Sequence, residues 1–181
     1  MRRILPSLFA VALVFSMTAC GDKENDNGNT DVNTGSTAET LKRGTVGNGS
    51  ITIGGYTYDN ANGVDFNNDG VLEFKIDDEY ISYNWTEGGN NIVNQANQWD
   101  YIEPIGTNVT IDANSRFEGQ GDATFENSAA LPELFFVGCR FVLSDGIHYG
   151  WIKMKKVDGQ LKWDECVYRT TPGVSITTGA N

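Results

Sequence analysis

The sequence has little positive charge, a single histidine and only 4 prolines in 181 residues. Its 13 Lys and Arg residues stand against 24 Asp and Glu residues, which gives a formal net charge of −11. A surface this acidic repels phosphate backbones, so the composition argues against nucleic-acid binding. The single histidine, His148, excludes metal sites that are built from several histidines. The length suits one domain of ordinary size.

The N-terminus has the features of a secretory signal. Met1-Arg2-Arg3 is a short basic start, and the uncharged run 4–17 follows it. This run is too short to span a bilayer, which takes ~20 apolar residues. It ends at Thr18-Ala19-Cys20-Gly21, which resembles a bacterial lipobox, where a cysteine becomes the lipid-bearing first residue. We expect residues 1–19 to be a lipoprotein signal peptide and Cys20 to be lipidated, with an ordinary secretory signal as the alternative.

Residues 20–48 are rich in Asn, Asp, Gly, Thr and Ser and have almost no apolar content. Such a segment cannot bury enough surface to fold, so we expect a disordered N-terminal tether that spans roughly 30 Å. Its start, Asp22-Lys23-Glu24-Asn25-Asp26, resembles the surface-export signal of Bacteroidota lipoproteins. That resemblance implies a lipid-anchored protein of the bacterial outer membrane, exposed on the cell surface. A plain solvated linker is the alternative.

Residues 49–181 indicate an all-β domain, because short β-branched and aromatic runs alternate with turn dipeptides. We expect an antiparallel β-sandwich, jelly-roll-like, with Asn62-Gly63, Asp69-Gly70, Asp145-Gly146 and Asp158-Gly159 as turns. Both faces of run 134–143 are apolar, which predicts a central strand. Gly150 lies inside a strand, which indicates a β-bulge or an aromatic ring packed on bare backbone, and the flanking Tyr149 and Trp151 fit the second case. The expected strands are 50–53, 71–76, 79–85, 99–102, 108–111, 134–143, 149–157, 161–168 and 174–177.

Three segments near the C-terminus carry a resemblance to an exported bacterial β-domain. They read FVGCRF (136–141), HYGWIK (148–153) and YRTTPGVSI (168–176). They are similar to the last strands of that domain, with its GFRF, HYGW and YAYE-TTPG type motifs. The same proteins open with an aspartate-rich segment, which residues 65–74 match. The family has no established activity, so the resemblance implies an extracytoplasmic domain without a recognised catalytic site. Cys139, Cys166 and Arg169 depart from its pattern.

The aspartate-rich segment is the strongest candidate for a metal site. Its oxygen side chains alternate along the chain, and Gly70 permits a sharp turn. An EF-hand loop would need Glu at its twelfth position, where this chain has Ile76, so that motif fails. A structural Ca²⁺ in a shorter loop is the hypothesis, and an ordinary turn is the alternative. The candidate ligands are Asp65, Asn67, Asp69, the Val71 carbonyl and Glu73.

Two further pairs of residues are candidates for a role. Cys139 and Cys166 could form a disulfide in an oxidising compartment. A simple meander, however, places a strand between them, about 10 Å apart and beyond the reach of a bridge, so two free thiols are the alternative. Trp85 and Trp99 flank the polar stretch 86–98. They could stack on sugar rings, with a core position as the alternative.

Catalytic motifs are missing from the sequence: there is no Gly-x-Ser-x-Gly elbow and no phosphate loop. We expect His148 to lie exposed at a hairpin edge. The favoured interpretation is a non-catalytic envelope lipoprotein of structural or adhesion type, stabilised by calcium. The alternative is a carbohydrate-binding surface lipoprotein, and a glycosidase that uses paired carboxylates ranks last. The expected partners are the membrane, through the lipid anchor, and a glycan or an envelope protein.

Overall fold

The computed structural model describes residues 40–77, 80–85 and 89–180. The predicted signal peptide (1–19), the predicted lipidation site Cys20 and linker residues 20–39 lie outside the described residues. The described part is built of β-strands, with one short 3₁₀ helix, η1 (Ser128–Ala130). This confirms the predicted all-β class. No helix in these ranges is long and apolar enough to cross a membrane.

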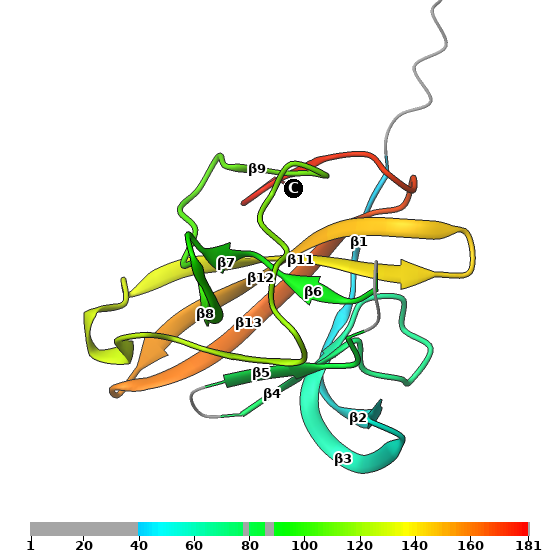
Figure 1. The fold of residues 1–181 in the computed structure, drawn as a ribbon, viewed down its shortest axis with the longest axis horizontal. Coiled ribbons are helices and arrows are strands. Elements are labelled where there is room, and N and C mark those ends of the chain that lie inside the picture. Colours follow the sequence, from blue (N-terminus) through cyan, green and yellow to red (C-terminus); the bar gives the residue numbers. More distant parts are fainter. Residues whose placement is uncertain (1–39, 78–79, 86–88, 181) are drawn as a thin grey trace, which may run out of the picture. The chain divides into compact units, whose positions relative to one another are not determined.

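The first sheet has five strands in the order β1-β13-β12-β11-β6. Its three long strands form the meander that the sequence predicts (Figure 1). The observed bounds of β11 equal the predicted ones. The turn between the last two long strands has positive φ at Asp158 (53°) and Gly159 (78°), as a tight hairpin turn requires. The strands are β1 (Leu41–Arg43), β6 (Asn91–Ile92), β11 (Leu134–Leu143), β12 (Gly146–Val157) and β13 (Gln160–Arg169).

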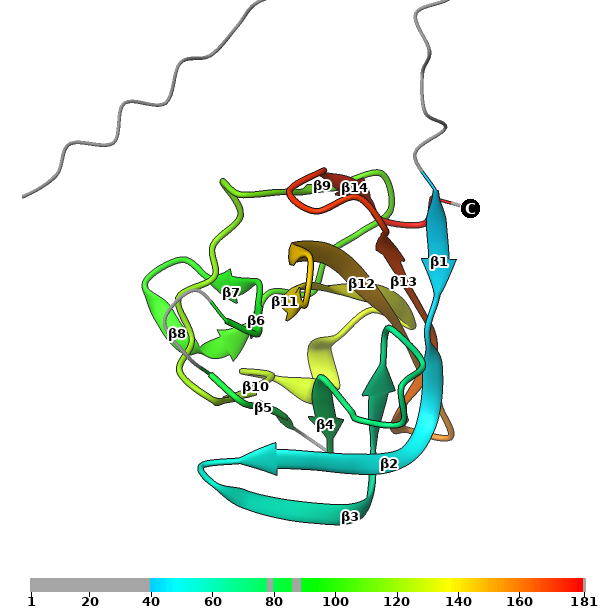
Figure 2. The same ribbon diagram turned by 90° about the vertical axis from the view of Figure 1, so that its right-hand side faces the viewer.

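The second sheet has seven strands in the order β2-β3-β4-β5-β10-β8-β7, and it lies across the core from the first (Figure 2). They are β2 (Thr45–Ile53), β3 (Tyr56–Asp65), β4 (Phe74–Ile76), β5 (Tyr80–Tyr83), β7 (Asn94–Gln95), β8 (Gln98–Ile102) and β10 (Asp122–Thr124). Strands β9 (Thr110–Ile111) and β14 (Ile176–Thr177) pair as a separate two-stranded sheet.

Two largely antiparallel sheets that enclose a core confirm the predicted antiparallel sandwich. Most neighbouring strands are also consecutive along the chain, so the sheets are mainly meanders. Jelly rolls instead cross between sheets at each Greek key. Here the hairpin turns are short enough to keep β2 to β5, and β11 to β13, in sequence order. One pair, β8 with β10, is parallel.

Two strands pass from one sheet to the other and join the sheets at opposite corners. At the first corner Gly44 separates β1 from β2, and its N–H donates to the Cys166 carbonyl at 3.1 Å. A Cβ on Gly44 would stand 2.7 Å from Phe66 Cα, so only glycine fits this corner. At the second corner Val93 separates β6 from β7. Its N–H donates to Gly138 in the first sheet, and its carbonyl accepts from Glu103, which follows β8.

The first corner corrects the predicted linker. Residues 41–48 belong largely to β1 and β2, so the folded domain begins before the boundary expected at residue 48. This segment has few apolar side chains, and the backbone hydrogen bonds of β1 to β13 and of β2 to β3 hold it. The predicted turn at Asn62-Gly63 is also wrong. Both residues lie inside β3, where a Cβ on Gly63 would stand 2.9 Å from the Leu72 side chain.

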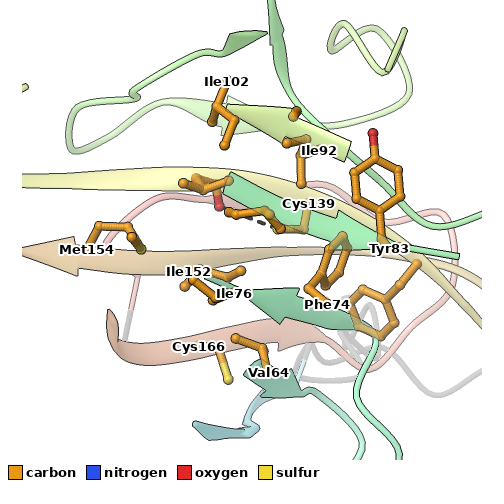
Figure 3. Packing of buried hydrophobic residues seen from close by; sticks show 14 of the residues in the cluster. Val64, Phe74, Ile76, Tyr83, Ile92, Ile102, Cys139, Ile152, Met154 and Cys166 are labelled. Atoms are coloured by element: carbon orange, nitrogen blue, oxygen red, sulfur yellow. Dashed lines mark hydrogen bonds between the residues drawn. The ribbon is translucent and has the colours of Figure 1, made fainter. Parts of the chain in front are cut away.

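The main core lies between the two sheets. It combines inward side chains of β3, β4 and β5 with those of β11, β12 and β13 (Figure 3). A second core lies on the other face of the first sheet, under the segment that contains β9 and the C-terminal β14. Phe136 packs there against Trp151, whereas Val137 enters the main core. Strand β11 is therefore buried on both faces, which confirms its predicted central position.

Gly150 shows the close packing that its position predicts. It lies on β12, and a Cβ there would stand 2.9 Å from the Phe66 ring. Phe66 in turn stacks on Phe141, with ring centroids 4.4 Å apart. The ring therefore rests on bare backbone, and glycine is required at this position.

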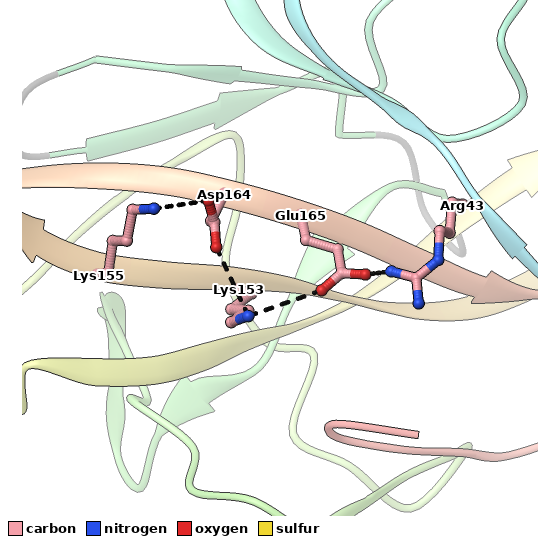
Figure 4. A network of polar contacts seen from close by, with 5 residues as sticks. All are labelled: Arg43, Lys153, Lys155, Asp164 and Glu165. Carbon is pink, nitrogen blue, oxygen red and sulfur yellow. Dashed lines mark hydrogen bonds and ion pairs between the residues drawn. The ribbon is translucent and has the colours of Figure 1, made fainter. Parts of the chain in front are cut away.

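Charged side chains form a ladder across β12, β13 and β1 (Figure 4). Lys155 contacts Asp164 at 2.7 Å, and Lys153 lies 3.5 Å from Asp164 and 3.8 Å from Glu165. Glu165 also pairs with Arg43, which ties the first described strand to β13. Exposed pairs of this kind contribute at most about 1 kcal/mol each.

Candidate functional site

The aspartate-rich segment forms a tight loop between β3 and β4, and Asp65 organises it. Asp65 ends β3 and is buried. Its Oδ1 accepts the N–H of Asn68 at 2.6 Å, and its Oδ2 accepts the N–H of Gly70 at 2.8 Å. Gly70 has φ of 89°, which residues with a side chain rarely adopt. The carboxylate therefore closes the loop around a glycine turn.

The neighbouring oxygens make bonds of the same kind. Asn67 Oδ1 accepts the N–H of Asp69 at 2.9 Å, and Asp69 Oδ1 accepts the N–H of Val71 at 2.8 Å. These are turns in which a side chain binds its own backbone two residues on. Within the described ranges, no group of three or more His, Cys, Asp or Glu side chains is arranged to hold a metal ion. The side-chain oxygens of the loop thus bind the loop's own backbone N–H groups. Calcium binding stays a prediction.

Glu73 is the most perturbed carboxyl group of the loop. It is 8% exposed, and its Oε2 accepts the N–H of Phe66 at 2.6 Å. Burial raises the pKa of Glu73 from 4.5 to about 8, and the negative charges of Asp65 and Asp69 act in the same direction, whereas the bond from Phe66 opposes them. At neutral pH this carboxyl group is therefore mostly protonated. A bound cation would reverse that preference.

An open groove of about 800 Å³ runs beside the loop. It is bounded by the loop, by β2, by residues that follow β5 and by the β11–β12 turn. Lys42 also lines it, against three carboxyl groups and three amides. The groove therefore favours a neutral polar or a cationic ligand over an anion. The six groups are Asn67, Asp69, Glu73, Asn84, Asn90 and Asp145.

Trp85 and Trp99 are both exposed, as a ligand-binding role requires, and their exposed fractions are 39% and 62%. Trp99 lies on β8, and Trp85 follows β5 in the same sheet. Trp151, by contrast, is a core residue, which is the usual position of an aromatic side chain in a sandwich. The structure thus leaves the first two tryptophans available to a ligand.

Part of the polar stretch between these tryptophans has a structural role. Asn91 and Asn94 are fully buried. Asn91 Nδ2 donates to the carbonyls of Phe117 and Gly119, and Asn94 Oδ1 accepts the N–H of Glu118. These amides hold the corner strand β6–β7 against segment 116–119. Residues 86–88 of this stretch lie outside the described ranges.

Cys139 and Cys166 are both free and buried, so the predicted disulfide is not present. Strand β12 lies between them, with Cys139 level with Gly150 and Cys166 level with Ile152. Burial raises the pKa of both thiols, to about 12 for Cys166. Both cysteines therefore act as core residues.

His148 is 1% exposed, so the expectation of an exposed hairpin residue is wrong. Its Nδ1 lies 2.8 Å from the Arg169 carbonyl, and its Nε2 lies 2.8 Å from Asp145 Oδ1. Both partners are hydrogen-bond acceptors, so both ring nitrogens face oxygen atoms. The bond from His148 holds the pKa of Asp145 below its usual range. The histidine links the β11–β12 turn to the end of β13.

Comparisons with known proteins found no matching family model, no matching curated protein and no matching solved structure. The resemblance of the C-terminal strands to an exported β-domain therefore stays a prediction. What the protein does has to be inferred from its own residues.

Proposed function

We propose that this protein is a non-catalytic module of the bacterial cell envelope: an outer-membrane lipoprotein with a structural or adhesive β-domain. One observation carries the proposal. Three described residues that could serve as a general acid or base, His148, Asp65 and Glu73, are buried and hydrogen-bonded to the backbone. A general acid or base must instead reach the proton that it transfers. These groups stabilise turns and strand ends.

The proposed anchor is Cys20, and the described domain begins about 20 residues later, at Thr40. If residues 20–39 form the tether that the sequence predicts, a chain of that length spans about 25 Å. Such a tether would hold the domain clear of the lipid headgroups. Strand β1 would connect the tether to β13 through its backbone pairing and the Arg43–Glu165 ion pair.

Metabolic labelling with a fatty-acid probe tests the anchor. We expect label on the full chain and none on a Cys20→Ser variant, because the other two cysteines are buried. An unlabelled chain that is released into the medium would contradict the proposal. Turnover of a polysaccharide by the purified protein would contradict its non-catalytic part.

Carbohydrate binding is the second candidate, and the exposure of Trp99 and Trp85 supports it. Tryptophan combines an apolar face with a polar edge, which suits the apolar faces and hydroxyl rims of sugars. Glycan-array binding that a Trp99→Ala variant loses would favour this candidate over a purely structural role. Binding that survives the substitution would remove Trp99 from the site.

Calcium at the 65–73 loop is the last part of the proposal. The crowding of Glu73, Asp65 and Asp69 supports it, because a divalent cation would offset their repulsion. A ligand that binds only the folded state must raise the Tm. A Tm that is equal in chelator and in millimolar Ca²⁺ would contradict this part of the proposal.

A further inference from the structure

The outward face of the seven-stranded sheet carries a set of aromatic side chains that lie far apart in the sequence. Along β5, β10 and β8, inward residues such as Ile81, Ala123 and Ile102 are buried in the main core. The alternate residues face outward, because side chains alternate along a strand. Tyr80 is 42% exposed and Trp99 is 62% exposed on this face.

The strand register places these side chains in two rows. In the first row, Tyr80 is level with Thr124, and Thr124 is level with Tyr101. The two tyrosines are therefore two strands apart, about 10 Å between their Cα atoms. Thr124, whose side chain is smaller than either ring, lies between them. This arrangement gives two aromatic platforms on one face of the sheet.

The second row runs parallel to the first. It contains Lys75, Ser82 and Asp122, which are level with one another on β4, β5 and β10. Trp99 lies two residues before Tyr101 on β8 and therefore faces the same side of the sheet. Hydrogen-bonding groups thus lie beside the aromatic row.

Lys75 and Asp77 are held in place at the edge of this face. Lys75 Nζ lies 2.6 Å from Asp77 Oδ2 and 5.7 Å from the centre of the Tyr58 ring. A hydrogen bond to Asp77 raises the pKa of Tyr80 and keeps its hydroxyl protonated. The polar groups are therefore fixed before any ligand arrives, which lowers the entropy cost of binding.

We infer that this face binds an extended, neutral polysaccharide, whose alternate rings stack on Tyr80 and Tyr101 while its hydroxyls bind the flanking polar groups. In an extended β-linked chain, every second ring presents the same face at a spacing near that of the two tyrosines. The inference rests on the carbohydrate-binding candidate and names its surface and ligand class.

Charge favours a neutral polymer over the alternatives. Asp77 and Asp122 outnumber Lys75 on the face, and the whole chain has a net charge of −11. Acidic polysaccharides, nucleic acids and anionic lipid surfaces would all be repelled. Carboxylates accept hydrogen bonds from the hydroxyls of a neutral sugar, and no charge repulsion opposes this contact.

The position of the face also fits a ligand that lies away from an anchoring membrane. In both ribbon views the described chain enters at β1, at the top, whereas β4 and β5 lie on the lower side (Figures 1 and 2). The main core lies between the first sheet, to which β1 belongs, and the second sheet.

Affinity electrophoresis of the full chain in detergent tests the inference. The gels contain neutral β-glucan, neutral β-xylan, mannan, or acidic alginate. We expect retardation by a neutral polysaccharide and none by alginate. Stacking contacts of this kind are worth about 1 kcal/mol, so Tyr80→Ala or Tyr101→Ala should weaken binding about 5- to 10-fold. Tyr101→Phe should bind nearly as well as the original chain.

Leu134→Ala is the matched control, because Leu134 is 48% exposed on β11, in the other sheet. Equal melting temperatures establish that each variant is folded. Preference for alginate, or no retardation in any gel, would overturn the inference. Binding that Trp85→Ala abolishes and both tyrosine variants retain would also overturn it, but would leave the carbohydrate-binding candidate standing.

Discussion

Replacement of Glu73 by glutamine should stabilise the protein above pH 8 and change little near pH 5. The folded protein keeps the Glu73 proton up to about pH 8, because the group is buried beside two other carboxylates. The unfolded chain releases it near pH 4.5. The free energy of unfolding therefore falls as the pH rises between these two values. Glutamine occupies the same volume without a charge, so the variant escapes this loss.

The magnitude follows from the pKa. Each tenfold change in proton affinity is worth about 1.4 kcal/mol. A pKa raised from 4.5 to about 8 thus corresponds to at most roughly 5 kcal/mol. Water that reaches the ionised Glu73 side chain reduces the free-energy cost of its buried charge. We therefore expect the variant to be about 2–4 kcal/mol more stable than the original chain at pH 9. The amide carbonyl that Glu73→Gln introduces can still accept the Phe66 N–H bond, which keeps the loop intact.

Urea unfolding in chelator at several pH values from 5 to 9 measures the effect. Glu126→Gln is the matched control, because Glu126 is exposed and should change stability equally little at every pH. Parallel stability curves for Glu73→Gln and the original chain would refute the reasoning. So would a Glu73→Gln protein that is less stable than the original chain at pH 9.

Other predictions address the core and the loop. Gly150→Ala should lower the free energy of unfolding by about 2–4 kcal/mol, because its Cβ would meet the Phe66 ring, and an unchanged Tm would contradict the packing. In a Cys20→Ser chain, a thiol reagent should reach Cys139 and Cys166 only after unfolding, and labelling of the native protein would show that these thiols are accessible. Millimolar Ca²⁺ should raise the Tm relative to chelator, and this rise should shrink in Glu73→Gln.

The elements that could be predicted best from the sequence are those whose signal is local. Strand β11 has its predicted bounds, because its run of apolar side chains on both faces is unbroken. The packing of an aromatic ring on Gly150 followed from a glycine inside a β-pattern. The turn at Asp158-Gly159 followed from a dipeptide that favours positive φ.

The sequence did not predict the elements whose bonding partners lie far away along the chain. Strand β3 contains few core side chains before Ala61, and its Asn-Gly pair is typical of a turn. Asn91 lies in a stretch whose composition is typical of a polar loop, but its buried amide binds carbonyls 26 and 28 residues away. His148 was expected at the surface because its partner, the Arg169 carbonyl, lies on a neighbouring strand that the local pattern does not show.

The candidate sites divide in the same way. The 65–73 loop was recognised from its spacing, because its hydrogen bonds join residues close in sequence. The rows of the second sheet were not, since Tyr80 and Tyr101 share a face only through β10. No sequence pattern indicates which strand will lie between two others.

Retention of a fluorescent neutral polysaccharide by intact cells tests most directly whether this is an anchored binding module. Cells that express the full chain should retain the polymer. A Tyr101→Ala chain should fail to retain it although it stays on the cell, and a Cys20→Ser chain should carry the polymer into the medium. Retention that depends on neither residue would contradict the account.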